Sequence, residues 1–352
     1  MKLPPSLREK IWGNRDLSPI FGPQPKPIGE VWYTFEENVI GNGAYRRRTL
    51  GEVMALLGPR LMGRRYRASG LRRTSAGEGK PDAALGQAYF PILSKLLFTA
   101  DKLSVQVHPD DAYALRHDGG PGKTEMWYVV HAAAGASIAL GLTKQLTPEA
   151  MRAAAEDGTI EQFLRWVPVL AGQTLFVEPG TLHSIGPGLV LWEIQQNSDL
   201  TYRFFDFGRL GDDGKPRPLH IGQAVAVTKQ EAHPGPTPAF RFPGAPANRE
   251  LLAACPYFAG ERLEWEGTLD YMPDADHADL LMFLRGEGHI GEDVYAAGDA
   301  YLIPAEAPPF AIAASSRTEV IRSYVPDLDV VRKELLQAGA NLRQMQRLVP
   351  TA

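Results

Sequence analysis

The stretch SVQVHPDD, residues 104–111, alternates polar and apolar side chains until it meets a proline. Successive side chains of a β-strand point to opposite faces, so Gln106 and His108 share one face of the predicted strand while two valines occupy the other. Two side chains that can bind a metal therefore point in one direction. We predict a strand that ends at the proline and presents its polar face to a site.

Two later stretches extend this pattern. In GKTEMWYVV, residues 122–130, strand alternation places Lys123 and Glu125 on one face, so a carboxylate lies beside an ammonium. In EPGTLHSIG, residues 178–186, His183 follows a Pro-Gly turn. Both stretches are therefore predicted to bring polar side chains to the same region as the first strand.

Four side chains in these stretches make up a candidate site for a divalent metal: Gln106, His108, Glu125 and His183. Imidazole, carboxylate and amide oxygen suit Zn²⁺ or another borderline divalent ion, and a site without thiolate is more often catalytic than structural. Each histidine taken alone is more often a hydrogen-bonded structural residue than a metal ligand. The combination of the four is what favours a metal.

The composition indicates an ordinary soluble protein rich in strands and turns. Its 35 glycines and 29 prolines fit many short strands joined by tight turns. The net charge of −4 gives no reason to expect nucleic acid or a membrane as a partner. The single cysteine, Cys255, excludes an intrachain disulfide and fits a reducing compartment, so we expect a cytoplasmic monomer or homodimer.

Three blocks of sequence carry a resemblance to a known family: SKLLFTADKLSVQVHPDD (94–111), GKTEMWYVV (122–130) and GQTLFVEPGTLHSIGPGLVLWEIQQNSDLTYRFFDFGR (172–209). The chain resembles class I mannose-6-phosphate isomerases of the short bacterial type, which are built from cupin units, a jelly-roll-like β-barrel fold. The resemblance covers most of the first 225 residues, and the third block is its most specific part.

The resemblance implies a mainly β fold and a role for each matching residue. In the family, the residues that match Gln106, His108, Glu125 and His183 hold a zinc ion. Those that match Lys95, Lys123, Asp199 and Arg203 line the substrate site. The expected cofactor is therefore Zn²⁺, or another divalent metal in its place, and the expected partner is a sugar phosphate.

An internal repeat predicts a second unit of the same kind. GQTLFVEPGT (172–181) is echoed by GDAYLIPAEA (298–307), and residues 125–141 have a looser counterpart in 280–294. In that counterpart the apolar Leu280, Met282 and Leu284 stand in place of ligands. The predicted division is a catalytic metal-binding cupin domain over 1–225 with a helical insertion near 147–166, a metal-free cupin domain over 226–325, and a C-terminal helix over 326–352.

Helical segments frame these units. Thr147 is a predicted N-cap, and residues 49–63 have the spacing of a short amphipathic helix. The C-terminal segment has an apolar side that includes Leu335 and Leu336, and docking on the chain's own barrel is favoured over a role in dimerisation. An arginine-rich segment at 58–73 is predicted to be a solvated face, with attraction of a phosphorylated sugar as the alternative, and residues 75–88 are predicted to be a loop.

Isomerisation of an aldose phosphate to a ketose phosphate needs a proton-transfer group, a stabiliser of the enediolate and a phosphate anchor. A divalent cation beside Lys123 favours the neutral amine, which makes it a proton-transfer candidate, together with Glu193 or a metal-bound hydroxide. Arg203 offers a fixed fork of donors for an oxyanion or the phosphate, and Lys95 serves either need as a point charge. Asp199 is expected to orient Arg203 or a sugar hydroxyl. The polar alternation from Glu193 to Arg203 also fits a merely solvated strand face.

The sequence therefore predicts metal-dependent interconversion of mannose 6-phosphate and fructose 6-phosphate through an enediol. The alternatives are another metal-dependent cupin enzyme, such as an oxygenase or a different sugar isomerase, and a non-catalytic cupin that binds sugar. Oxygen-using cupins commonly carry His-x-His on the first ligand strand, so the amide of Gln106 disfavours them.

Overall fold

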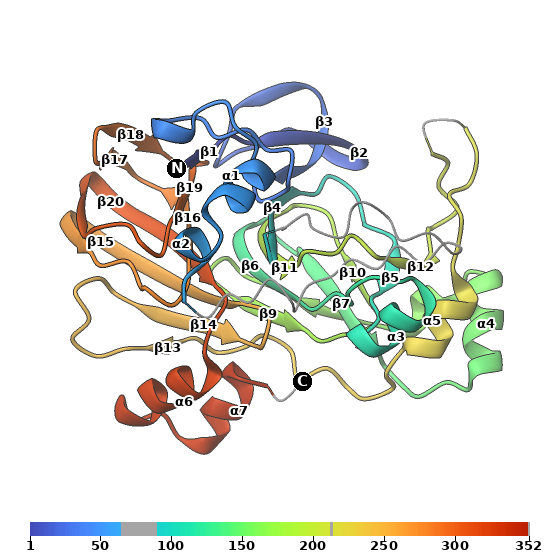
Figure 1. The fold of residues 1–352 in the computed structure, drawn as a ribbon. Helices are drawn as coiled ribbons and strands as arrows, with labels where there is room; N and C mark the ends of the chain where they lie inside the picture. Colours follow the sequence, from blue (N-terminus) through green and yellow to red (C-terminus); the bar gives the residue numbers. More distant parts are fainter. Residues whose placement is uncertain (65–89, 212–213, 351–352) are drawn as a thin grey trace.

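The computed structural model describes residues 1–64, 90–211 and 214–350, which contain twenty strands and seven α-helices (Figure 1). The predicted mainly β class is confirmed. The predicted loop at 75–88 and most of the arginine-rich segment at 58–73 lie outside the described residues.

Two antiparallel sheets form a sandwich in the first two thirds of the chain. The six-stranded sheet has the order β2 (Ser6–Asp16), β3 (Pro23–Trp32), β4 (Ile92–Phe98), β11 (Leu189–Gln196), β6 (Glu125–Ala132) and β9 (Thr174–Val177). The five-stranded sheet has the order β12 (Tyr202–Phe205), β5 (Val105–Val107), β10 (His183–Ile185), β7 (Ser137–Leu142) and β8 (Leu164–Pro168). Buried side chains from both, among them Leu97, Trp127, Leu140 and Ile185, form one apolar cluster between the sheets.

A third, nine-stranded sheet contains all the remaining strands of the described residues. Its main path is β1 (Lys2–Leu3), β19 (Ala300–Ile303), β16 (Asp279–Arg285), β20 (Phe310–Tyr324), β15 (Ala259–Tyr271), β14 (Glu250–Ala254) and β13 (Phe240–Arg241). A hairpin of β17 (Glu287–Ile290) and β18 (Asp293–Ala296) branches from β20. The first strand of the chain therefore joins the sheet made largely by its last third.

The strand order β4-β11-β6-β9 of the first sandwich recurs as β15-β20-β16-β19. In β6, Glu125 lies opposite Val177, and in β16 Asp279 lies opposite Ile303, at the same end of the matching strand pair. The hydrogen-bond register therefore gives Glu125 a charged counterpart, Asp279. The predicted alignment, which put the apolar Leu280 in that place, is wrong by one residue, because apolar side chains in both strands left the register undetermined.

The central strands of the six-stranded sheet are buried on both faces. Trp127 points into the sandwich, whereas Met126 and Tyr128 join a second apolar cluster with residues of the nine-stranded sheet such as Leu252 and Met282. This arrangement explains why β4 and β11 are buried along their whole length. Strand β6, which begins with Glu125, is thus held from two sides.

Short helices cover the ends of the sheets. They are α1 (Leu50–Leu57), α2 (Pro59–Met62), α3 (Asp111–His117), α4 (Pro148–Glu156), α5 (Ile221–Val227), α6 (Leu328–Gln337) and α7 (Leu342–Leu348), with 3₁₀ turns at Gly43–Tyr45 and Thr159–Phe163. The predicted cap is present, since the Thr147 hydroxyl accepts a hydrogen bond from Ala150 N at 3.2 Å. Within the described residues, no helix has the length and apolar character needed to cross a membrane.

The predicted single C-terminal helix is two helices. Gly339, with a φ of 88°, follows α6 in the left-handed region that glycine adopts without strain, and the chain turns before α7. Buried Val331, Leu335 and Leu348 pack on Leu251 and other residues of the nine-stranded sheet. The helices therefore dock on the chain's own sheet, whereas Leu336 is 60% exposed.

Leu335 and Leu336 offer a matched pair of substitutions for this docking. Leu335 is fully buried, so Leu335→Ala should lower the free energy of unfolding by about 2–5 kcal/mol, the usual cost of an apolar cavity. Leu336→Ala should change it by less than about 0.5 kcal/mol. Urea unfolding of both variants measures the difference, and equal effects would contradict the docking.

Candidate metal centre and adjoining cavity

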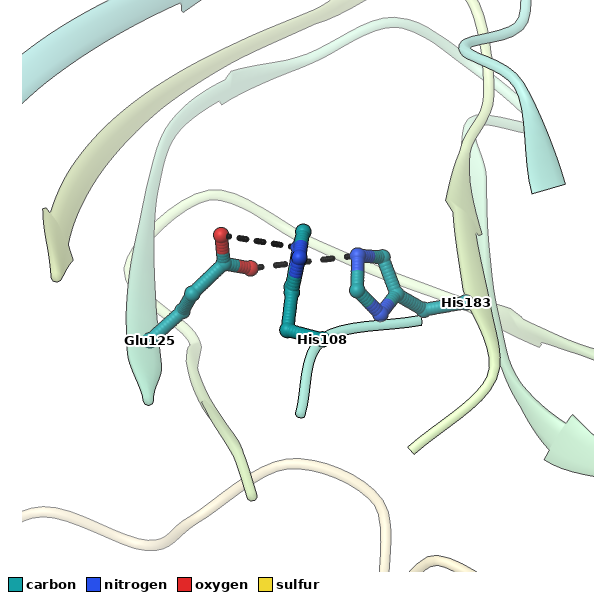
Figure 2. A group of neighbouring side chains, drawn as sticks. All are labelled: His108, Glu125 and His183. Atoms are coloured by element: carbon teal, nitrogen blue, oxygen red, sulfur yellow. Dashed lines mark ion pairs between the residues drawn. The ribbon is translucent and has the colours of Figure 1, made fainter. Parts of the chain in front are cut away.

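Three ligand-capable side chains meet at the edge of the first sandwich. His108 follows β5, Glu125 begins β6 and His183 begins β10, where it lies opposite Gln106 in the strand pair. Their ligand atoms all lie within 4.8 Å of one another, and all three side chains are buried (Figure 2). The strand alternation that predicted a shared direction for these groups agrees with this geometry.

Backbone carbonyls fix the orientation of both imidazoles. His108 Nδ1 donates to the Leu200 carbonyl at 2.8 Å, and His183 Nδ1 donates to the Thr181 carbonyl at 2.9 Å. With the proton on Nδ1, each Nε2 keeps a lone pair and faces the carboxylate of Glu125, at 3.3 Å for His108 and 3.8 Å for His183. This second hydrogen bond is the usual way in which proteins orient a metal-binding histidine.

Charge and burial keep the three ligands in the forms that bind metal. Burial, to which neighbouring His108 adds, lowers the pKa of His183 to about 3. Burial opposes the charge of Glu125, but Lys123, at 2.8 Å, holds the pKa of that carboxyl well below its usual range. The site thus consists of two neutral imidazoles and a carboxylate.

The residues fit a divalent metal. Among the described residues, buried His108 Nε2 and Glu125 Oε2 have no hydrogen-bond partner, although lone pairs in a buried site need a donor or a cation. Two imidazoles and one carboxylate are a donor set that Zn²⁺ accepts while keeping a position open. No other group of three such side chains meets the same distance criterion in the part of the chain that the structure describes.

Gln106, the fourth predicted ligand, lies beside this group. Its Nε2 is 3.3 Å from His183 Nε2, and its Oε1 accepts a hydrogen bond from Ser104 Oγ at 3.2 Å. A half-turn of the amide would place Oε1 next to the imidazole. Its role as a metal ligand stays a prediction.

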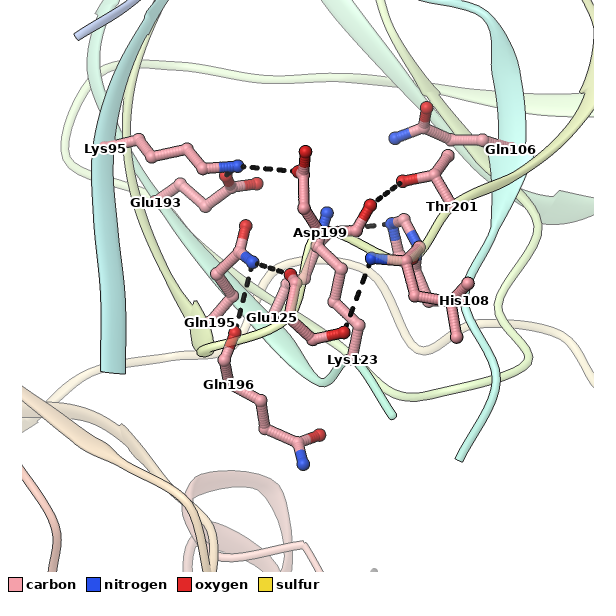
Figure 3. A network of polar contacts seen from close by, with 12 residues as sticks. Lys95, Gln106, His108, Lys123, Glu125, Glu193, Gln195, Gln196, Asp199 and Thr201 are labelled. Atoms are coloured by element: carbon pink, nitrogen blue, oxygen red, sulfur yellow. Dashed lines mark hydrogen bonds and ion pairs between the residues drawn. The ribbon is translucent and has the colours of Figure 1, made fainter. Parts of the chain in front are cut away.

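A cavity of about 260 Å³ adjoins the group, and it brings together all five residues predicted from the sequence for the substrate site. Figure 3 shows four of them, Lys95, Lys123, Glu193 and Asp199. The five residues are Lys95 on β4, Lys123 before β6, Glu193 on β11, Asp199 after β11 and Arg203 on β12. Their side chains come from both sheets of the sandwich, so the cavity forms where the two sheets pack together.

Alternating charges line one side of this cavity. Lys95 Nζ lies 3.5 Å from both Glu193 Oε2 and Asp199 Oδ1, and above the ring of Trp32. Farther out, Lys10 Nζ lies 3.2 Å from Glu30 Oε2. Acidic and basic groups therefore neutralise one another along this side.

Glu193 differs from the neighbouring charged groups because it is only partly ionised near neutral pH. Burial and nearby Glu125 raise the pKa of Glu193 to about 7, although Lys95 opposes this shift. Its Oε1 accepts a hydrogen bond from Trp127 Nε1 at 2.9 Å, which fixes its orientation. A carboxyl that is half ionised near neutral pH is able to give or take a proton.

The opposite side of the cavity carries Arg203 and Arg217, and Arg217 Nη2 is paired with Asp206 Oδ1 at 2.6 Å. Arg203 Nη1 donates to the Pro218 carbonyl at 2.9 Å, and its buried Nε has no hydrogen-bond partner among the described residues. Burial lowers the pKa of Arg203, and nearby Arg217 lowers it further. Asp199 pairs with Lys95 rather than with Arg203, so the contact with Arg203 that we offered as one alternative is not observed.

Sequence reasoning missed several residues that line the cavity: Lys10, Trp12, Glu30, Thr201 and Arg217. The alternation that links Lys10 and Trp12 on β2 was a usable signal, since both point to one face. Arg217 had none, because a loop separates it from Arg203.

Antiparallel sheets around a buried His-Glu-His group, open to a charged cavity, define a metal-dependent enzyme of the jelly-roll-like class. The chain matches no family model. It is 34% identical over 309 residues to the mannose-6-phosphate isomerase of Streptococcus mutans, and the matched residues cover 85% of this chain and 90% of the relative. It is 31% identical over 310 residues to mannose-6-phosphate isomerase ManA of Bacillus subtilis, covering 85% and 91%.

The chain belongs to the mannose-6-phosphate isomerase family, so the resemblance seen in the sequence is confirmed. Its fold agrees with the crystal structure of the mannose 6-phosphate isomerase from Bacillus subtilis, with a TM-score of 0.77 and 28% identity. That match covers 92% of this chain and 98% of the other.

The low pKa of His183 makes the metal-free protein sensitive to acid. Its pKa is about 3 in the folded chain against an ordinary 6.5, so below pH 6.5 the unfolded chain binds a proton that the folded chain does not. The free energy of unfolding should therefore fall as pH falls from 6.5 toward 3. Between pH 6.5 and 5.5 this residue should contribute a loss of about 1 kcal/mol.

Urea unfolding of the metal-free wild type and His183→Gln at both pH values measures this contribution. The wild type should lose about 1 kcal/mol more than the variant over that interval. Identical pH dependence in the two proteins would contradict a neutral, buried His183.

Proposed function

We propose that this chain interconverts mannose 6-phosphate and fructose 6-phosphate in a metal-dependent reaction. The observation that carries the proposal is the position of the buried His-Glu-His group beside a cavity that holds an ammonium, a guanidinium and a carboxyl with a raised pKa. The family relationship supports the same substrate and the same aldose–ketose isomerisation.

The proposed metal is Zn²⁺, held by His108, Glu125 and His183 with Gln106 as a fourth ligand. When bound, it supplies a Lewis acid that favours negative charge on the sugar oxygens at C1 and C2. The carboxylate and the two neutral imidazoles suit this ion, as argued above.

Two side chains are proposed to move protons. Isomerisation transfers one proton between C2 and C1 and another between their oxygens. Glu193, with a pKa of about 7, is available in both forms near neutral pH, and Lys123 lies beside Glu125 on the same side of the sandwich. Trp127 and Lys95 hold Glu193 in place, so it meets the substrate in one orientation.

The substrate phosphate is proposed to bind at the side of the cavity formed by Arg203 and Arg217. The unpartnered Arg203 Nε and the proximity of the two guanidinium groups favour an anion there. Lys95 is already paired with Glu193 and Asp199, so it is proposed to bind a sugar oxygen instead.

Other features of the protein follow as proposals. Residues 1–225 and 226–325 would be two cupin units, supported by the repeated strand order, with 326–352 docked on the second. The protein would act in the cytoplasm as a monomer or homodimer, without nucleic acid or membrane partners, in keeping with one buried cysteine and a net charge of −4.

A coupled assay for fructose 6-phosphate tests the proposal. Purified protein loaded with zinc should turn over mannose 6-phosphate, lose activity in EDTA and regain it with Zn²⁺. His183→Ala should lose bound zinc and activity, while Arg203→Ala should keep one zinc per chain and lose activity by about 100-fold or more. Fully metallated wild type without turnover, or an Arg203→Ala protein without zinc, would refute the assignment.

Arg217→Ala tests the proposed phosphate side. Loss of one guanidinium from the anion site should raise the KM for mannose 6-phosphate by about tenfold and change kcat little, because the contact is distant from C1 and C2. Arg241→Ala, which removes an exposed arginine paired with Glu250, is the control and should leave both constants unchanged. A fall in kcat with constant KM would place Arg217 in a different role.

A further inference from the structure

The segment that carries Lys123 is held by the start of helix α3. Gly122 N donates to Asp111 Oδ1 at 2.8 Å, and Lys123 N donates to the Pro109 carbonyl at 3.0 Å. A Cβ at Gly122 would lie 2.5 Å from the backbone carbon of Asp110, so the two backbones are in direct contact. The position of Lys123 therefore depends on where α3 begins.

The same carboxylate also reaches the end of β11. Asp111 Oδ1 accepts a second hydrogen bond from Gln196 Nε2 at 2.9 Å, and Gln196 Oε1 accepts one from Thr124 N at 2.8 Å. Gln196 N donates in turn to the Thr124 carbonyl at 3.1 Å. One aspartate thus fixes the residues on both sides of Lys123, directly and through Gln196.

The other oxygen of Asp111 is held from the far part of the chain. Tyr257, in the turn between β14 and β15, donates its hydroxyl proton to Asp111 Oδ2 at 2.7 Å. The turn is itself anchored, because Cys255 N bonds to the Phe258 carbonyl at 2.8 Å and the Phe258 ring is fully buried. Tyr257 therefore links the nine-stranded sheet to the segment beside the metal centre.

We propose that Asp111 and Tyr257 are positioning residues that hold Lys123 in its catalytic place. Neither residue lines the cavity, so they act through the backbone of 122–124 and not on the substrate. This gives the metal-free part of the chain a function in the reaction. The expected effect on kinetics rests on the proposed isomerase function, whereas the expected effect on the 122–124 segment does not.

Four variants test the link. Asp111→Ala removes the acceptor, Asp111→Asn keeps an oxygen for Gly122 and Gln196, and Tyr257→Phe removes only the hydroxyl. Tyr128→Phe is the matched control, since Tyr128 also donates its hydroxyl proton to a carboxylate of the nine-stranded sheet, Glu319, at 2.6 Å, but does not contact the 122–124 segment. Amide hydrogen exchange of the peptide around residues 119–126, zinc content and steady-state kinetics are measured for each.

In Asp111→Ala we expect exchange of that peptide to rise by about tenfold or more, and kcat to fall by a similar factor with KM and zinc content unchanged. Tyr257→Phe should show a smaller effect of the same kind, and Asp111→Asn should stay within about threefold of wild type. Tyr128→Phe should change neither the exchange of this peptide nor kcat.

Unchanged exchange in both Asp111→Ala and Tyr257→Phe would overturn the proposal whatever the activity. So would loss of zinc in Asp111→Ala, or an equal fall of kcat in Tyr128→Phe, because either result would indicate a general loss of structure. Absence of turnover in the zinc-loaded wild type would refute the isomerase function alone, and the exchange data would still decide whether Asp111 and Tyr257 hold the segment.

Discussion

The burial of the Glu125 carboxylate is the constraint on which the site depends. A buried charge costs several kcal/mol unless it is paired and oriented. Lys123 supplies the pairing, and two imidazoles turn their lone pairs toward the same point. Strand β6 can carry this group because one face of the strand packs inside the sandwich and the other on the nine-stranded sheet, which leaves its first residue little freedom to move.

The strand position that matches Glu125 in the nine-stranded sheet is also acidic, but its carboxylate has different partners. Asp279, the counterpart of Glu125 by register, accepts hydrogen bonds from Arg322 Nε at 2.9 Å and from the Tyr271 hydroxyl at 2.7 Å. Burial opposes the charge of Asp279, but Arg322 holds its pKa at about 2. A guanidinium therefore neutralises the carboxylate of Asp279, whereas the proposed metal ion would neutralise that of Glu125. The difference lies in the partner, since both strands keep the buried acid.

Local patterns predicted much of the site, and long-range register decided the rest. Strand alternation was enough to place Gln106 with His108, because a side-chain period of two leaves only two faces. It could not assign Asp279, since a shift of one residue between apolar strands leaves their composition unchanged. The family resemblance supplied Lys95 and Arg203. Partners such as Tyr257 are set by how two sheets pack, for which a single sequence carries no signal.

The two sides of the cavity differ in how strongly dissolved salt screens their charges. Lys95 is only 2% exposed and its partner Glu193 only 6%, so dissolved salt hardly reaches this pair. The side formed by Arg203 and Arg217 is more open, and because Arg217 is paired with Asp206 whereas Arg203 donates to a carbonyl, this side keeps a positive charge that mobile ions do screen. In the proposed binding mode, ionic strength would therefore act on the capture of an anionic sugar, whereas the buried Lys95–Glu193 pair keeps its field in any physiological medium.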